Sequence, residues 1–161
     1  MYKFASIIAT IGFLILPPLV GQAPDTVALA DLTIAALPHG TDTAAVRRLL
    51  GPPLQVIRHT QRNDDGALLV DWRYPGLLLS FAAGALYTAD VSSRKYRTLR
   101  GVQVGDSVAV VARHYGKPLY GGTTASVYAI SSSDFEHLGI EFVYENGLIT
   151  RIITGEVISV E

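Results

Sequence analysis

Hydrophobic positions along the chain follow two periodicities, one helical and one typical of strands, and each occurs twice. Apolar side chains recur at helical spacing before Gly51, and again before Gly116, so a short helix is predicted to end at each glycine. After each helix the pattern changes to runs typical of strands, and Trp72 alternates there with polar neighbours. The predicted strands cover residues 54–60, 67–74, 77–82 and 86–91, and then 126–131, 140–144 and 148–154.

The two helical segments are also similar in sequence, at a separation of 65 residues. Six identical residues coincide when residues 40–53 are placed over residues 105–118. Thr41 and Asp106 then occupy equivalent places at the helix starts, where a side-chain oxygen can accept from first-turn amides. The predicted caps and turns are therefore Gly40, Thr41, Gly51, Gly105, Asp106 and Gly116.

These patterns predict an α+β fold made of two tandem units. Each unit is a helix followed by an antiparallel β-meander, with the helices packed on one face of a curved antiparallel sheet. The predicted bounds are a signal peptide at residues 1–30, unit 1 at 31–93 and unit 2 at 94–161, the two units forming one compact domain. The basic residues of the segment 92–100 indicate a solvated connector or, alternatively, a patch for an acidic partner.

The N-terminal segment is typical of a secretory signal peptide. Lys3 precedes an apolar run at residues 4–16, which is too short for a comfortable membrane span. Cleavage is predicted near Ala23 or Ala30, and the alternative is an uncleaved anchor or a buried helix. We therefore predict a periplasmic or secreted protein with no stable membrane span after cleavage.

Composition excludes several kinds of site. With 13 Lys+Arg against 14 Asp+Glu, the net charge is −1, so the chain has no long-range positive field that would attract nucleic acid. The absence of cysteine excludes a disulfide framework, a thiolate metal site and attachment as a lipoprotein. The four histidines lie on separate segments, and Ser133 with His137 has no third group that would orient a base. We predict no metal, no cofactor and no enzymatic activity.

One stretch resembles a known superfamily. Residues 98–107, running on to 114–118, resemble the opening of the repeat in β-lactamase-inhibitor-protein-like and SmpA/OmlA (BamE-type) proteins. The resemblance spans roughly residues 33–154 and implies two tandem units that form one curved sheet with helices on its convex side. This chain has no cysteine, so it departs from the SmpA/OmlA group in lacking a lipoprotein attachment site and from the inhibitor proteins in lacking disulfides.

Aromatic residues on or near the predicted strands are the candidate binding residues, since aromatic side chains make good interface anchors. They are Trp72, Tyr74, Tyr120, Tyr128 and Phe135. Trp72 shares strand parity with Leu68 and Val70, which also suits a position in the core. We predict an exported, non-enzymatic module that engages an envelope or secreted protein through its sheet face or loops. The alternatives are a carrier of a small apolar or sugar-like ligand, and an inhibitor of a secreted or periplasmic hydrolase.

Overall fold

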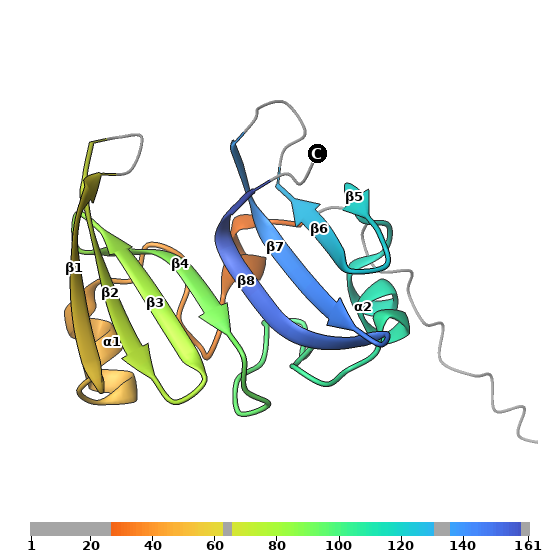
Figure 1. The fold of residues 1–161 in the computed structure, drawn as a ribbon, viewed down its shortest axis with the longest axis horizontal. Helices are drawn as coiled ribbons and strands as arrows, with labels where there is room; N and C mark the ends of the chain where they lie inside the picture. The colour runs from red at the N-terminus through yellow and green to blue at the C-terminus, as the bar shows by residue number, and fades with distance from the viewer. Residues whose placement is uncertain (1–26, 63–65, 131–135, 159–161) are drawn as a thin grey trace, which may run out of the picture.

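The computed structural model of the protein describes residues 27–62, 66–130 and 136–158. Eight strands form one antiparallel sheet in the order β1-β2-β3-β4-β8-β7-β6-β5 (Figure 1). The strands are β1 (Gln55–Arg62), β2 (Leu68–Tyr74), β3 (Leu77–Ala82), β4 (Ala85–Val91), β5 (Tyr120–Gly121), β6 (Ala125–Ala129), β7 (Glu136–Glu145) and β8 (Leu148–Ile158). The helices are η1 (Leu29–Leu32), a 3₁₀ helix, and the α-helices α1 (Thr43–Leu50) and α2 (Val108–Tyr115). None of these helices is long and apolar enough to cross a membrane.

The predicted architecture of two tandem helix-plus-meander units is wrong. Thr88 to Val91 of β4 pair directly with Gly155 to Ile152 of β8, so all eight strands belong to one large sheet. A separate meander would leave unpaired backbone groups on both of its edge strands, and pairing β4 with β8 satisfies those on one edge of each meander. The α+β class holds only in the broad sense that helices accompany an antiparallel sheet.

The two α-helices do not cover the sheet by themselves. Each has eight residues, or about 12 Å of length, against a sheet of eight strands. Two irregular segments, residues 27–37 and 96–104, complete the covering layer and pair with each other through an Ile34–Thr98 bridge. Ile34 and Val102 are fully buried there. Loop backbone therefore does much of the covering that the sequence pattern assigned to helices.

Both helices begin one residue later than predicted. Asp42, not Thr41, caps α1, and its Oδ1 accepts from the Ala45 N–H at 2.7 Å. Ser107, not Asp106, precedes α2. The reason is a backbone bond to the sheet: Thr41 O accepts from the Leu86 N–H, and Asp106 O accepts from the Ile149 N–H, each at 2.8 Å. These bonds hold Thr41 and Asp106 in extended chain.

The predicted ends of the helices are confirmed at Gly51 and Gly116. Their φ angles are 79° and 72°, but their ψ angles of −169° and −139° are extended and not left-handed helical. Glycine adopts this region because it has no Cβ. The predicted turn residues Gly40 and Gly105 each come three residues before a helix, and their N–H groups donate to Leu86 O and Ile149 O.

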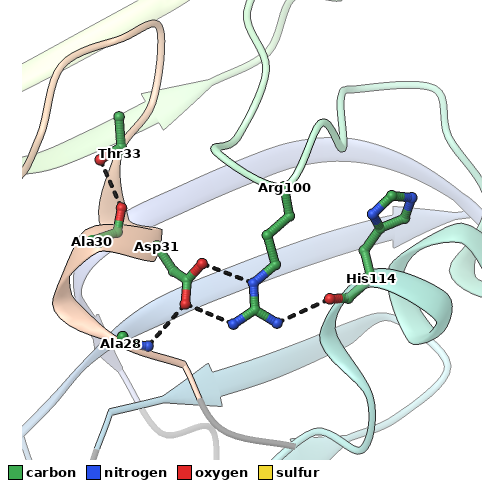
Figure 2. A network of polar contacts seen from close by, with 6 residues as sticks. All are labelled: Ala28, Ala30, Asp31, Thr33, Arg100 and His114. Atoms are coloured by element: carbon green, nitrogen blue, oxygen red, sulfur yellow. Dashed lines mark hydrogen bonds and ion pairs between the residues drawn. The ribbon is translucent and has the colours of Figure 1, made fainter. Parts of the chain in front are cut away.

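A buried ion pair joins the irregular layer to α2 (Figure 2). Arg100 Nε and Nη2 donate to the two carboxylate oxygens of Asp31, each at 2.7 Å, and Nη1 donates to His114 O at 2.9 Å. The Ala28 N–H donates to the same carboxylate at 2.9 Å. The two side chains are only 17% and 9% exposed, so the prediction of a solvated connector is wrong for Arg100.

Candidate functional site

Three of the five predicted binding aromatics lie in the core. Trp72, Tyr74 and Tyr128 are 7%, 8% and 3% exposed, on the side of the sheet that faces the helices. Trp72 packs against Phe81 with ring centroids 4.9 Å apart. Their rings are therefore not presented to a partner at the surface of this structure. The sequence had left a core position open for Trp72 and for Tyr128.

The hydroxyls of two of these residues stabilise the helix ends. Tyr74 Oη donates to Gly51 O at 3.0 Å, and Tyr128 Oη donates to Gly116 O at 3.2 Å. Burial raises the pKa of Tyr128 to about 12, so this hydroxyl remains a donor across the neutral range. Each bond satisfies a carbonyl at a helix terminus that has no partner within the helix.

Replacing Tyr128 with phenylalanine is expected to lower the free energy of unfolding by about 1 kcal/mol, because one hydrogen bond to Gly116 O is lost while the ring still packs. Urea denaturation measures the change, and Tyr74→Phe is a matched variant with a similar expected loss. Unchanged stability in both variants would contradict the proposed role of these hydroxyls.

The two remaining candidates differ in position. Tyr120 lies on the edge strand β5 and is 44% exposed, so its ring is available at the surface. Phe135 lies outside the described residues. Of the predicted aromatics, Tyr120 is therefore the residue that the structure places at an accessible position.

The face of the sheet opposite the helices carries a continuous row of side chains. Alternate residues of a strand point to opposite faces, and the buried residues Trp72, Leu79 and Ala89 point toward the helices. On the other face, successive register partners link one residue from every strand: Gln55, Arg73, Leu78, Asp90, Ile153, Glu141, Val127 and Tyr120. All except Val127 are at least partly exposed. We call this row, with its neighbours Ile57, Asp71, Ser80, Val143 and Arg151, the open face.

Apolar side chains occupy much of the open face. Leu78, Ile153 and Ile57 are half-buried although no helix of the described residues packs over them. They lie on β3, β8 and β1, and polar residues such as Asp71 and Asp90 stand beside them on the same face. A sheet face that carries apolar side chains and no covering helix is a candidate interaction surface.

Charged groups on the open face are only partly paired. Arg151 forms a two-point ion pair with Asp90. Glu141, one strand further, is half-buried and accepts no hydrogen bond within the described part of the chain. Burial raises the pKa of Glu141, Arg151 lowers it, Asp90 raises it, and the result is a pKa above the ordinary value. This carboxylate would gain from a cation brought by a partner.

A second unpaired charge lies on β2. The Arg73 guanidinium is exposed and forms no ion pair with any described residue. Arg73 and Arg151 both line an open hollow of about 240 Å³, together with Leu78 and Asp90. The open face therefore presents a free cation near one end and a free carboxylate toward the other.

Serine, histidine and aspartate meet on the open face, but their geometry differs from that of a hydrolase. His59 Nε2 lies 2.8 Å from Asp71 Oδ2, and Ser80 Oγ donates to Asp71 Oδ1 at 2.7 Å. Both groups contact the carboxylate and not each other, so His59 does not act as a base on Ser80. Sequence reasoning missed this cluster because the three residues meet only through the register of β1, β2 and β3.

The sequence analysis also considered a serine nucleophile and a metal site. Ser133 and Asp134 lie outside the described residues, as does the side chain of His137. Among the described residues, no three His, Asp or Glu side chains gather as a metal site would require.

No family model matches the chain, and no curated protein matches it. Two solved structures are similar. An extracellular protein of Bacillus anthracis str. Ames that contains an SCP domain has 9% identity and a TM-score of 0.47, over 94% of this chain and 50% of that one. The chain thus spans half of that protein's length. A proposed β-lactamase inhibitor protein of Streptococcus mutans has 16% identity and a TM-score of 0.30, over 70% and 81% of the two chains. Both TM-scores are below 0.5, so the resemblance to the β-lactamase-inhibitor-protein-like superfamily stays a prediction.

Proposed function

We propose that this chain is an exported, non-enzymatic module that binds another protein through its open face. The observation that carries the proposal is the combination of half-buried apolar residues and a half-buried carboxylate, Glu141, that accepts no hydrogen bond within the described residues, on one sheet face that no described helix covers. A partner that covers Leu78 and Ile153 removes apolar surface from water, which drives most protein association.

The charges on the open face specify the partner's chemistry. Arg73 and Glu141 are four strand positions apart in the row, or about 19 Å along the sheet. The intervening Asp90–Arg151 pair is internally neutral. A complementary partner would therefore place an acidic side chain over Arg73 and a basic side chain over Glu141. Such complementarity sets orientation and specificity more than affinity.

Of the two predicted cleavage sites, the folded N-terminal segment favours the one near Ala23. Val27 is 4% exposed in the core, and the Ala28 N–H donates to Asp31. Cleavage near Ala30 would remove both contacts, whereas cleavage near Ala23 would keep them. N-terminal sequencing of the protein recovered from a bacterial host tests this choice.

Replacing Leu78 with aspartate is expected to reduce capture of the partner about tenfold, since truncating or charging a central interface residue costs 1–2 kcal/mol or more. The measurement is a pull-down from envelope and secreted fractions with the full chain, followed by mass spectrometry. Leu99→Asp is the matched control, because Leu99 is 58% exposed in the connector and away from the open face.

Equal capture by wild type, Leu78→Asp and Leu99→Asp would exclude the open face as the binding surface. If no specific protein were captured from either fraction, the proposal that this chain is a protein-binding module would be refuted. Glu141→Lys adds a second readout: a partner with a basic side chain at this site should be lost, while the melting temperature stays within a few degrees of wild type.

A hollow beside β5 favours a small-ligand carrier as the second candidate. Its volume is about 450 Å³, within the usual range of ligand pockets, and the lining is uncharged. Leu119, Tyr120, Gly121, Gly122, Thr124, Ala125 and Val127 line it. A ligand that binds only the folded chain would raise its melting temperature, and Tyr120→Ala should abolish that rise. Inhibition of a secreted hydrolase is the narrower form of the first proposal, tested by adding the protein to a panel of such enzymes.

A further inference from the structure

The two ends of the sheet differ in what they offer to another chain. β5 ends the sheet with two residues, whereas β1 ends it with eight (Figure 1). β1 pairs with β2 on one side. On its other side no described strand follows, so the outward N–H and C=O groups of alternate residues remain available. A long edge of this kind is a template for an added strand.

Apolar side chains accompany this edge. Leu54 and Val56 are 75% and 38% exposed, and Val56 lies opposite Trp72, which places it on the helix side of the sheet. Leu49 of α1, 53% exposed, is the third large apolar residue in this part of the chain. Proteins commonly protect a sheet edge with charged residues or with a short strand. Exposed leucine and valine give this edge no such protection. We call these three residues and the outer backbone of β1 the β1 edge.

Positive charge surrounds the β1 edge. Arg48 of α1 and Arg58 of β1 are exposed, and neither pairs with a carboxylate among the described residues. Asp71, the described carboxylate on β2, is already bound by His59 and Ser80. Asp64 and Asp65, between β1 and β2 in the sequence, lie outside the described residues. A second copy of the chain would bring the same cations to this edge, and like charges on paired strands repel.

We propose that the β1 edge docks an extended, acidic segment of a partner protein as a ninth strand of the sheet. Main-chain hydrogen bonds to β1 supply the attachment, as in other complexes formed by strand addition. Apolar side chains two residues apart in the segment cover Leu54 and Val56, and acidic side chains approach Arg58 and Arg48. This site is separate from the open face and does not depend on the function proposed for it.

The first test uses peptides and the full chain. The probe is a ten-residue peptide that alternates glutamate with valine, and its control alternates lysine with valine. At low ionic strength the glutamate peptide should bind at least about fivefold more tightly, because each exposed charge contact contributes up to about 1 kcal/mol. Amide hydrogen exchange, followed by NMR, should show new protection of alternate amides in β1. Equal affinity of the two peptides, or protection on β5 or elsewhere, would overturn the proposal.

Two further measurements identify the mode of binding. The glutamate peptide is N-methylated at one or the other set of alternate residues, and one of the two forms should lose binding because it cannot donate to β1. Arg58→Glu should weaken the unmodified peptide about fivefold, whereas Arg113→Glu, an exposed change on α2, should not. Binding that survives both N-methylations, or that ignores Arg58→Glu, would refute strand addition. Leu78→Asp should leave peptide affinity unchanged. A failure of the strand-addition proposal can therefore be distinguished from a failure of the proposal that the open face binds a protein.

Discussion

Replacing Gly155 with alanine is expected to lower the free energy of unfolding by about 4 kcal/mol, the largest effect of any single change considered for this chain. Gly155 lies in β8 with a φ of +111°, opposite Thr88 of β4. A Cβ at this position would lie 2.1 Å from Tyr87 O and 3.0 Å from Thr88 Cα. Both atoms belong to backbone, so they cannot rotate away as the end of a side chain would.

The strands can relieve this overlap only by separating β4 from β8. That pairing joins β1–β4 to β5–β8, and it comprises four register positions. The expected loss therefore combines the strain of a non-glycine residue at positive φ with the lost pairing, each costing about 1–3 kcal/mol. Chemical denaturation, followed by circular dichroism, measures it.

Gly84→Ala is the matched control for this prediction. Gly84 also has a positive φ, +84°, but a Cβ there would meet no atom within 4 Å. Its expected loss is only the backbone strain, about 1–2 kcal/mol. If Gly155→Ala cost no more than Gly84→Ala, the close approach of β8 to β4 would not hold in solution.

Replacing Arg100 with leucine is expected to cost about 2 kcal/mol at pH 7. The change leaves the Asp31 carboxylate, in a residue that is 6% exposed, without its cation and removes the donor to His114 O. It also removes the guanidinium that lies 4.7 Å from the centre of the Tyr115 ring. Breaking a fully buried pair costs about 3–5 kcal/mol, and the figure is reduced here because both side chains retain some contact with water.

The loss should depend on pH in a defined direction. Burial alone would raise the pKa of Asp31, but the hydrogen bonds from Arg100 and the Ala28 N–H outweigh it, and the pKa lies below its ordinary value of 3.8. A carboxyl group with a lowered folded-state pKa stabilises the fold above its unfolded pKa, and this contribution disappears as the pH falls through the folded pKa. The difference in stability between wild type and Arg100→Leu should therefore shrink below about pH 4.

The double variant Asp31→Asn, Arg100→Leu tests whether the two residues act as a pair. Removing the orphaned charge should restore part of the stability lost in Arg100→Leu, because neighbouring residues in one ion pair are not additive. Additive losses, or a difference that persists unchanged at pH 3, would show that Arg100 acts through packing alone.

Local structure was largely predictable from residue patterns. Helical spacing of apolar residues and the glycines Gly51 and Gly116 located both α-helices, because helix periodicity and termination depend on neighbours in sequence. The strand at residues 77–82 was predicted with the bounds that the structure shows. The predictions at 140–144 and 148–154 were too short, because β7 begins four residues earlier and β8 ends four residues later. The two-residue strand β5 and helix η1 were missed, because such short elements have no period to detect.

The candidate surfaces were not predictable in the same way. Tyr74 and Tyr128 were predicted as binding residues but lie in the core, because strand alternation shows which residues share a face and not which face a helix covers. Arg100 lies in a basic connector and pairs with Asp31, 69 residues earlier, which no spacing rule relates. The open face and the β1 edge exist only once the order and register of eight strands are known.

By itself, the sequence of this chain determined the approximate positions of both α-helices and of seven strands, because those features follow from interactions between residues a few positions apart. The tertiary structure decided that β4 pairs with β8 in a single sheet, that irregular segments 27–37 and 96–104 share the covering layer, and which residues of each strand remain exposed. These outcomes depend on hydrogen bonds and packing between residues distant in sequence, and on the requirement that strand edges be paired wherever pairing is possible.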